Sequence, residues 1–210
     1  MKTFLFQGDS ITDAGRVDEN CDNFGLGCGY AFLLASDIEK NKKGAVKFIN
    51  RGKSGDRITD VYTRIKEDII NLKPDYMSIL IGANDVSHEL TQGCGVSPVK
   101  FRKIYNMLIE EIKEALPEIK IIILEPFVLK GTATTELWQQ FDSEVRTLAE
   151  ISGQVAKNFG LKFVPLQNKF DEASADGDTR YWSVDGIHPT SAGHQIIKEE
   201  LKKSIEDILN

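Results

Sequence analysis

The residues best suited to covalent chemistry are Ser10, near the start of the chain, and Asp185 and His188, near its end. A serine hydroxyl becomes a good nucleophile only when a base removes its proton, and a carboxylate must hold that base in one tautomer. The sequence Asp185-Gly-Ile-His188 supplies a carboxylate and a base on one short turn, and Gly186 lets the backbone bend so that the two side chains can meet. These residues indicate nucleophilic catalysis, with Ser10 as nucleophile, His188 as general base and Asp185 as the group that orients it.

The same residues also have a structural explanation. Asp and Ser are favoured at turns and at helix N-caps, so Gly8-Asp9-Ser10 is equally typical of a turn that leads into a helix. Asp185 can likewise cap the last helix of the chain. Position in the fold decides between the two explanations.

Ser10 and Asn84 each follow a short apolar segment that is typical of a buried strand, residues 2–7 and residues 76–81. In an open α/β sheet, ligands bind at the edge formed by the carboxyl ends of the strands. If these two strands are neighbours, the Asn84 amide lies beside Ser10 and can donate to a developing oxyanion. The backbone N–H of Gly55, in a turn after another strand, is a second candidate donor. The alternative is that Asn84 and Gly55 are ordinary turn residues.

Strand patterns and helix patterns alternate along the chain. Strands are predicted at residues 2–7, 46–50, 76–81, 119–124 and 162–165, and helices at 30–40, 58–72, 101–116, 137–159 and 192–208. Residues 15–29, 82–85 and 166–180 are assigned to loops or turns. Because each connection is long enough for a right-handed crossover, we predict an α/β protein, a three-layer α/β/α sandwich with a five-stranded parallel sheet.

Composition limits the classes of function. With 210 residues, 41% of them hydrophobic, and no linker-like segment, the chain is predicted to form one domain over residues 1–210. The net charge of -6 is spread along the sequence, which argues against nucleic acid and anionic membranes as partners. The sequence leaves formation of a homo-oligomer open.

Cysteine usage and the N-terminus predict the compartment. The three cysteines include no CxxC pair, so neither a disulfide framework nor a zinc site is expected, and no metal or other cofactor is predicted. The apolar run before Gly8 is too short for a signal peptide, and no segment reaches transmembrane length. We expect a cytoplasmic protein.

Four ordered motifs resemble those of the SGNH subgroup of GDSL esterases and lipases. They are Gly8-Asp9-Ser10, Asn50-Arg-Gly-Lys-Ser-Gly55, Gly82-Ala-Asn84-Asp85 and Asp185-Gly-Ile-His188-Pro189. The resemblance covers nearly the whole chain. It implies the flavodoxin-like SGNH hydrolase fold, a triad of Ser10, His188 and Asp185, and an oxyanion hole made by Ser10, Gly55 and Asn84.

Longer motifs are similar to those of the cytoplasmic acetylxylan esterases in that family. They are Gly8-Asp-Ser-Ile-Thr-Asp-Ala-Gly-Arg16, Gly27-Cys-Gly-Tyr30 and the segment from Lys73 to Val86. This similarity implies a serine esterase that removes acetyl groups from short carbohydrates such as xylo-oligosaccharides. Asp9, Tyr30 and Trp182 are then the expected substrate contacts.

Two other functions remain open at this point. A thioesterase or lysophospholipase uses the same machinery on other acyl groups, although no long apolar insertion predicts a lid or an acyl tunnel. A carbohydrate-binding protein on a hydrolase scaffold is the other alternative, and the presence of all the expected catalytic residues argues against it.

Overall fold

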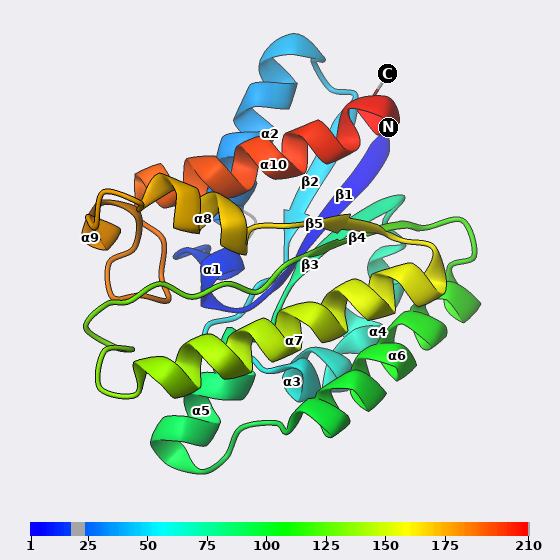
Figure 1. Ribbon diagram of the computed structural model, residues 1–210. Helices are drawn as coiled ribbons and strands as arrows, with labels where there is room; N and C mark the ends of the chain where they lie inside the picture. Colours follow the sequence, from blue (N-terminus) through cyan, green and yellow to red (C-terminus); the bar gives the residue numbers. More distant parts are fainter. Residues whose placement is uncertain (18–23, 210) are drawn as a thin grey trace.

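The computed structural model describes residues 1–17 and 24–209 (Figure 1). Its centre is one sheet of five parallel strands in the order β2-β1-β3-β4-β5. The strands are β1 (Lys2–Gly8), β2 (Val46–Asn50), β3 (Tyr76–Leu80), β4 (Lys120–Leu124) and β5 (Lys162–Val164). The predicted α/β fold is confirmed.

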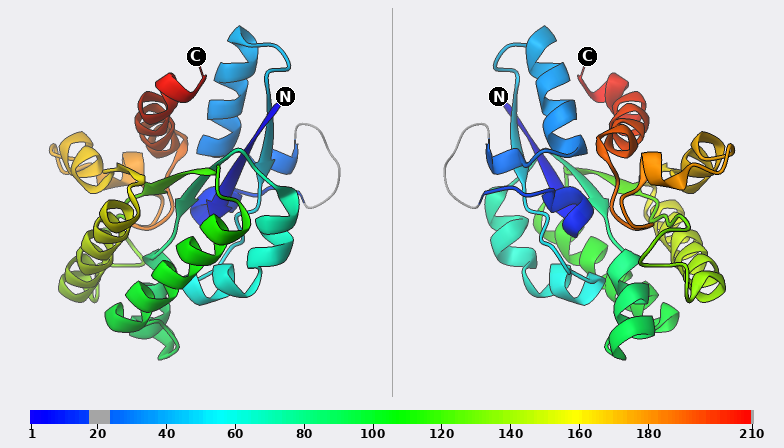
Figure 2. Two further views of the ribbon diagram at one scale, coloured as in Figure 1. Left: turned by 90° about the vertical axis from the view of Figure 1, so that its right-hand side faces the viewer. Right: turned by 90° about the vertical axis from the view of Figure 1, so that its left-hand side faces the viewer.

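Two layers of helices cover the sheet, one on each face, as the two side views show (Figure 2). One layer holds α3 (Ile58–Thr63), α4 (Ile65–Asp68), α5 (Ala83–Gln92), α6 (Pro98–Ala115) and α7 (Trp138–Phe159). The other holds α2 (Tyr30–Asn41), α8 (Gln167–Ala173) and α10 (Ser191–Leu209). Short helical segments lie in the connections: α1 (Ser10–Asp13), η1 (Phe24–Leu26), η2 (Ile70–Leu72) and α9 (Thr179–Trp182).

The central strands are apolar on both faces because each face packs against a helix layer. Successive side chains of a strand point to opposite faces, so Leu5 of β1 joins one core while its neighbours Phe4 and Phe6 join the other. All three are fully buried. Burial of both faces fixes the register of the strands, since a shift by one residue would exchange the two faces.

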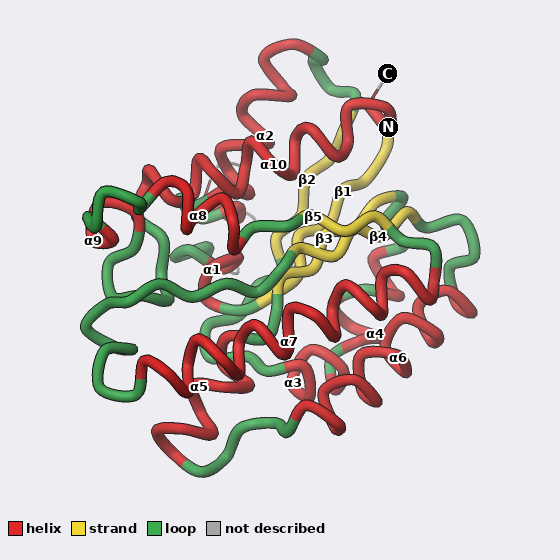
Figure 3. Tube along the Cα trace, viewed as in Figure 1, coloured by secondary structure: helices red, strands yellow, loops and turns green. Residues whose placement is uncertain are grey.

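Pairing brings the carboxyl ends of the strands to one edge. Gly8 at the end of β1 pairs with Leu80 at the end of β3, and Leu80 pairs with Leu124 at the end of β4. The segments that follow these strands lie at the end of the molecule away from the two termini (Figure 3). The residues after β1 and β3 therefore start from adjacent positions.

The structure corrects three parts of the prediction. The helix predicted at residues 58–72 is three short pieces, α3, α4 and η2. The Thr63 hydroxyl donates to the Asp60 carbonyl at 2.8 Å and so competes with the helical hydrogen bonds near the first break. Residues 83–85, predicted as a turn, form the first turn of α5, and the predicted loop 166–180 contains α8 and the start of α9.

Two further expectations concern the predicted loop near Ser10 and membrane-spanning segments. Part of the predicted loop at residues 15–29, including Cys21, lies outside the described residues. Within residues 1–17 and 24–209, no helix combines the length and the apolar character that crossing a membrane requires.

Candidate active site

Ser10, His188 and Asp185 lie in a hydrogen-bonded row. The Ser10 Oγ is 2.9 Å from His188 Nε2, and His188 Nδ1 is 2.7 Å from Asp185 Oδ2. The carboxylate accepts from Nδ1–H, which leaves Nε2 to accept the Ser10 hydroxyl proton. Ser10 and His188 are 178 positions apart in sequence, and the fold brings them together.

Ser10 is presented by a tight turn between β1 and α1. It is the first residue of α1, and the Asp9 side chain caps that helix by accepting from the Ile11 N–H at 2.9 Å. A Cβ on Gly8 would lie 2.3 Å from the Leu80 carbonyl oxygen, so only glycine fits where β1 passes β3. The turn is therefore packed directly on the neighbouring strand.

Asp185 and His188 are held by an Asx-type turn. The second carboxylate oxygen of Asp185, Oδ1, accepts from the backbone N–H groups of Ile187 at 2.9 Å and His188 at 2.8 Å. Partial burial opposes ionisation of this carboxyl, but the hydrogen bonds from His188 and Ile187 outweigh it and lower the pKa of Asp185 to about 2. The hydrogen bond to Asp185 in turn raises the pKa of His188 above its ordinary value, although partial burial opposes this.

The three predicted oxyanion donors come from three separate segments. Asn84 lies in the first turn of α5 and is buried, and its Nδ2 donates one hydrogen to the Asp56 carbonyl at 3.1 Å. The second Nδ2 hydrogen remains available. Gly55 has a φ of +84°, a conformation that favours glycine. The backbone N–H groups of Ser10 and Gly55 donate to no residue within the described part of the chain.

Two predicted substrate contacts, Tyr30 and Asp9, have almost no exposed surface in the structure. Tyr30 has no exposed surface, and its hydroxyl bonds to Thr12 Oγ1 at 2.9 Å within the core. Asp9 is 1% exposed and serves as the α1 cap. Burial raises the pKa of Asp9 to about 7, although the Ile11 hydrogen bond and the nearby His188 offset part of this effect. Both side chains hold the short helix α1, which begins with Ser10.

Trp182 differs from those two residues. It is partly buried against the core beside α10, and its ring meets Tyr181 edge-on at 4.9 Å. Tyr181 is 60% exposed, as is Val184, the residue before Asp185. A substrate role for Trp182 stays a prediction.

Sequence reasoning missed several residues that hold the site. Ser183 Oγ accepts from the Gly186 N–H at 2.9 Å and donates to the His188 carbonyl at 3.0 Å. The carbonyl of Asp56 fixes the Asn84 amide. No motif marks these residues, because a backbone carbonyl carries no sequence signal and Ser183 is one of many loop serines.

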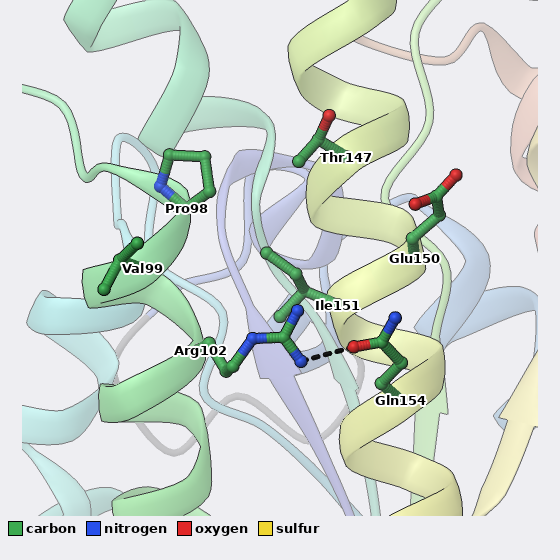
Figure 4. Close-up of a pocket in the computed structure, with 7 residues that line it drawn as sticks. All are labelled: Pro98, Val99, Arg102, Thr147, Glu150, Ile151 and Gln154. Atoms are coloured by element: carbon green, nitrogen blue, oxygen red, sulfur yellow. Dashed lines mark hydrogen bonds between the residues drawn. The ribbon is translucent and has the colours of Figure 1, made fainter.

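One groove lies elsewhere on the molecule. It has a volume of about 180 Å³ and runs between α6 and α7, where Arg102 donates to Gln154 (Figure 4). Its other lining residues are Pro98, Val99, Thr147, Glu150 and Ile151. None of the predicted site residues lines this groove.

With this geometry in view, comparison with known proteins is decisive for the family. Residues 6–196 match the model of the GDSL-like lipase/acylhydrolase family. The chain belongs to that family. It is therefore a carboxylic ester hydrolase, and its substrates are small-molecule esters.

Several relatives of this GDSL-like hydrolase are similar over almost their whole length. An acetylxylan esterase of Geobacillus stearothermophilus is 30% identical over 213 residues, which covers 96% of this chain and 92% of that protein. A crystal structure of that esterase has a TM-score of 0.84 and covers 98% of this chain and 94% of its own, at 30% identity. A structure described as a GDSL-like lipase from Parabacteroides merdae has a TM-score of 0.90 at 33% identity, with 100% and 96% coverage.

Proposed function

We propose that this ester hydrolase uses Ser10, His188 and Asp185 as a catalytic triad to remove acetyl groups from short carbohydrates such as xylo-oligosaccharides. The observation that carries the proposal is the row of hydrogen bonds from Ser10 Oγ through His188 to Asp185, at 2.9 and 2.7 Å. These are the distances at which a base can take the proton of a nucleophile.

The reaction follows from this row. Ser10 Oγ attacks the acetyl carbonyl carbon and its proton passes to His188 Nε2; the ester C–O bond then breaks and the sugar oxygen takes the proton from His188. Water, deprotonated by the same nitrogen, attacks the acetyl-Ser10 ester and releases acetate, and the proton returns to Ser10. Asp185 stays ionised throughout and stabilises the imidazolium, in keeping with its low pKa.

The negative charge of each tetrahedral intermediate needs donors. We assign this task to the backbone N–H groups of Ser10 and Gly55 and to the Asn84 amide. The hydrogen bond from Asn84 to the Asp56 carbonyl supports this assignment, since it holds the amide in one orientation before substrate arrives.

The similarity to the Geobacillus esterase supports both the triad and the substrate. Structures of that protein with a serine, an aspartate or a histidine replaced by alanine are described as catalytic mutants. That protein is also described as an acetyl-xylooligosaccharide esterase. In this chain His188 has a half-exposed side chain, and the exposed Val184 donates its N–H to the His188 carbonyl at 2.8 Å. Tyr181, in the same segment, is also exposed. An open rim of this kind suits a hydrophilic sugar ring, with Tyr181 and Trp182 as the aromatic surfaces on which it can stack.

A panel of para-nitrophenyl esters tests the acyl group. We expect acetate to be cleaved far faster than octanoate, because an acetyl group needs little apolar volume. Acetylated xylo-oligosaccharides, followed by mass spectrometry, should lose acetyl groups one at a time, each with a mass decrease of about 42 Da. The Ser10→Ala enzyme is the control.

Two results would move the assignment. A preference for octanoate, or hydrolysis of acyl thioesters with acetylated sugars left intact, would favour the thioesterase or lysophospholipase function. Binding of the sugars without hydrolysis would favour a carbohydrate-binding protein.

A further inference from the structure

The connection between β4 and α7 is hydrogen-bonded to the backbone of the segment that contains Asp185. The Leu129 N–H donates to the Gly186 carbonyl at 2.8 Å, and the Ala133 N–H donates to the Asp185 carbonyl at 2.9 Å. Two successive carbonyls of the acid–base turn are thus fixed by one loop. We call residues 129–134 the cradle; in Figure 1 the connection runs from the sheet to the end of the molecule where α9 lies.

The Thr134 side chain closes the cradle. It has no exposed surface, and its hydroxyl donates to the Leu129 carbonyl at 2.8 Å while it accepts from the Gly131 N–H at 2.9 Å. The residue that supports Gly186 is therefore tied to the next turn of the loop by a single side chain. One hydroxyl satisfies a donor and an acceptor that would otherwise lack these partners.

The fit between cradle and turn leaves no space. A Cβ on Gly131 would lie 2.2 Å from the carbonyl carbon of Asp185. Gly186 has a φ of +104°, and a Cβ there would lie 2.6 Å from Thr134 Oγ1. Any displacement of the cradle is therefore passed on to the Asp185 backbone.

The cradle is anchored to a rigid part of the molecule. Gln167, which is buried in α8, accepts from the Val128 N–H and donates to the Val128 carbonyl, both at 2.9 Å. Beside it the rings of Phe127 and Phe170 stack with centroids 4.0 Å apart. The start of the cradle is therefore fixed, and the Thr134 hydroxyl links Leu129 to Gly131. The Thr179 hydroxyl also holds this loop, by donating to the Lys130 carbonyl at 2.7 Å.

We propose that Thr134 is a positioning residue that acts through the cradle to hold the Asp185 carboxylate in line with His188. The carboxylate and the cradled carbonyl belong to the same residue, so a shift of one moves the other. This inference rests on the proposed function, because it assigns Asp185 to the support of His188. It adds a residue from a loop that carries none of the recognised motifs.

Two carboxyl groups and a second histidine lie in the surroundings of His188. Asp185 and Asp9 both favour its protonated form. His194 of α10 is buried, and burial lowers its pKa to about 4, so it is neutral at ordinary pH. Asp185 is the main cause of the raised pKa of His188, so a misplaced Asp185 should lower the pH at which His188 loses its proton.

The test replaces Thr134 by valine, which keeps the shape of the side chain and removes the hydroxyl. We expect kcat on para-nitrophenyl acetate to fall roughly 10–10²-fold, as small misplacements of catalytic groups do, with KM nearly unchanged. The acid limb of the kcat/KM profile should move to lower pH. Thr134→Ser should restore both quantities.

Thr135→Val is the matched control. The Thr135 hydroxyl donates to the Gly131 carbonyl at 2.7 Å from the exposed side of the same loop, but it bonds neither Leu129 nor the Gly131 N–H. We expect this variant to keep the wild-type kcat and pH profile. Equal effects of the two valine variants would contradict a specific role for Thr134.

A lower melting temperature with unchanged kcat and pH profile would show a purely structural role and overturn the inference. If Thr134→Val does not fold, Thr134→Ala takes its place, since it also removes the hydroxyl and adds no atom to the tightly packed loop; a wild-type pH profile there also overturns the inference. Full activity of Ser10→Ala would instead remove the proposed function, so the two failures are distinguishable.

Discussion

The nucleophile and the acid–base pair are held by different means. Ser10 and Asn84 follow β1 and β3, two central strands paired from Phe4 and Tyr76 to Gly8 and Leu80. Asp185 and His188 lie in a segment whose only strand-like pairing among the described residues is a single bridge between Ser183 and Pro189. One half of the site is built on the sheet, and the other on contacts between loops.

The difference shows where precision comes from in each half. The sheet is fixed by a core buried on both faces, so the nucleophile and the Asn84 amide share the stability of the whole fold. The acid–base turn depends on a few hydrogen bonds: the Asp185 carboxylate and the Ser183 hydroxyl accept from backbone N–H groups of the turn, and the loop after β4 donates to its carbonyls. Loop substitutions should therefore alter the acid–base chemistry while the nucleophile stays in place.

The largest expected effects come from removing either half. Ser10→Ala and His188→Ala should each lower kcat by roughly 10⁴–10⁶-fold without unfolding the protein, because nucleophile and base act as a unit. Steady-state kinetics with circular dichroism as the folding control measures this. If His188→Ala kept most of the activity, the loop-built half would have no part in the chemistry.

A smaller loss is expected within the sheet-built half. Asn84→Ala should reduce kcat by about 10²–10³-fold with little change in KM, because a donor to developing charge acts in the transition state. Initial rates over a range of substrate concentrations separate the two constants. A steep rise in KM at constant kcat would make Asn84 a ground-state contact.

The pH profile probes the loop-built half. His188 must be neutral to act as base, and its pKa is raised by the hydrogen bond to Asp185, so kcat/KM should rise with pH through an apparent pKa above about 6.5. Asp185→Ala should move this limb to lower pH and cost less in kcat than His188→Ala. A limb that does not move would mean that Asp185 does not act on His188.

The smallest expected effect is on the melting temperature, through the buried Asp9 next to Ser10. The buried Asp9 carboxyl has its pKa raised to about 7 from about 3.9 in an unfolded chain, so ionisation costs stability increasingly as pH rises between these values. Asp9→Asn can still accept from the Ile11 N–H and carries no charge. Its melting temperature relative to wild type should therefore be higher at pH 8 than at pH 5, by a few degrees, since roughly 1 kcal/mol shifts the Tm by about 2–4 °C in a domain of this size. The same difference at both pH values would show that Asp9 is not the buried charge.

The sheet-built half could largely be predicted from sequence. Apolar strands ending in Gly-Asp-Ser10 and Gly-Ala-Asn84 already indicate one edge of a parallel sheet, because the period and length of such runs are local properties. The sequence predicts Tyr30 as a substrate contact because it belongs to one of the motifs. A motif does not indicate whether an aromatic side chain faces the core or the solvent. In the structure the Tyr30 ring packs in the core against Phe6 and His194.

The supports of the loop-built half had no comparable signal. Asp185-Gly-Ile-His188 indicates its own turn, but the bond from Ala133 to the Asp185 carbonyl joins backbone atoms more than fifty residues apart in sequence. Any residue other than proline carries such an N–H. Only glycine fits at position 131 because of the Asp185 backbone, but the sequence does not distinguish Gly131 from other loop glycines.

Covalent labelling of Ser10 tests the central claim most directly. A fluorophosphonate reacts with a serine only when a base and an oxyanion site activate it, and the adduct is located by peptide mass spectrometry. The account predicts one adduct per chain, on Ser10, with labelling lost in Ser10→Ala and slowed strongly in His188→Ala. An adduct on a different residue, or an unlabelled protein that still hydrolyses para-nitrophenyl acetate, would contradict it.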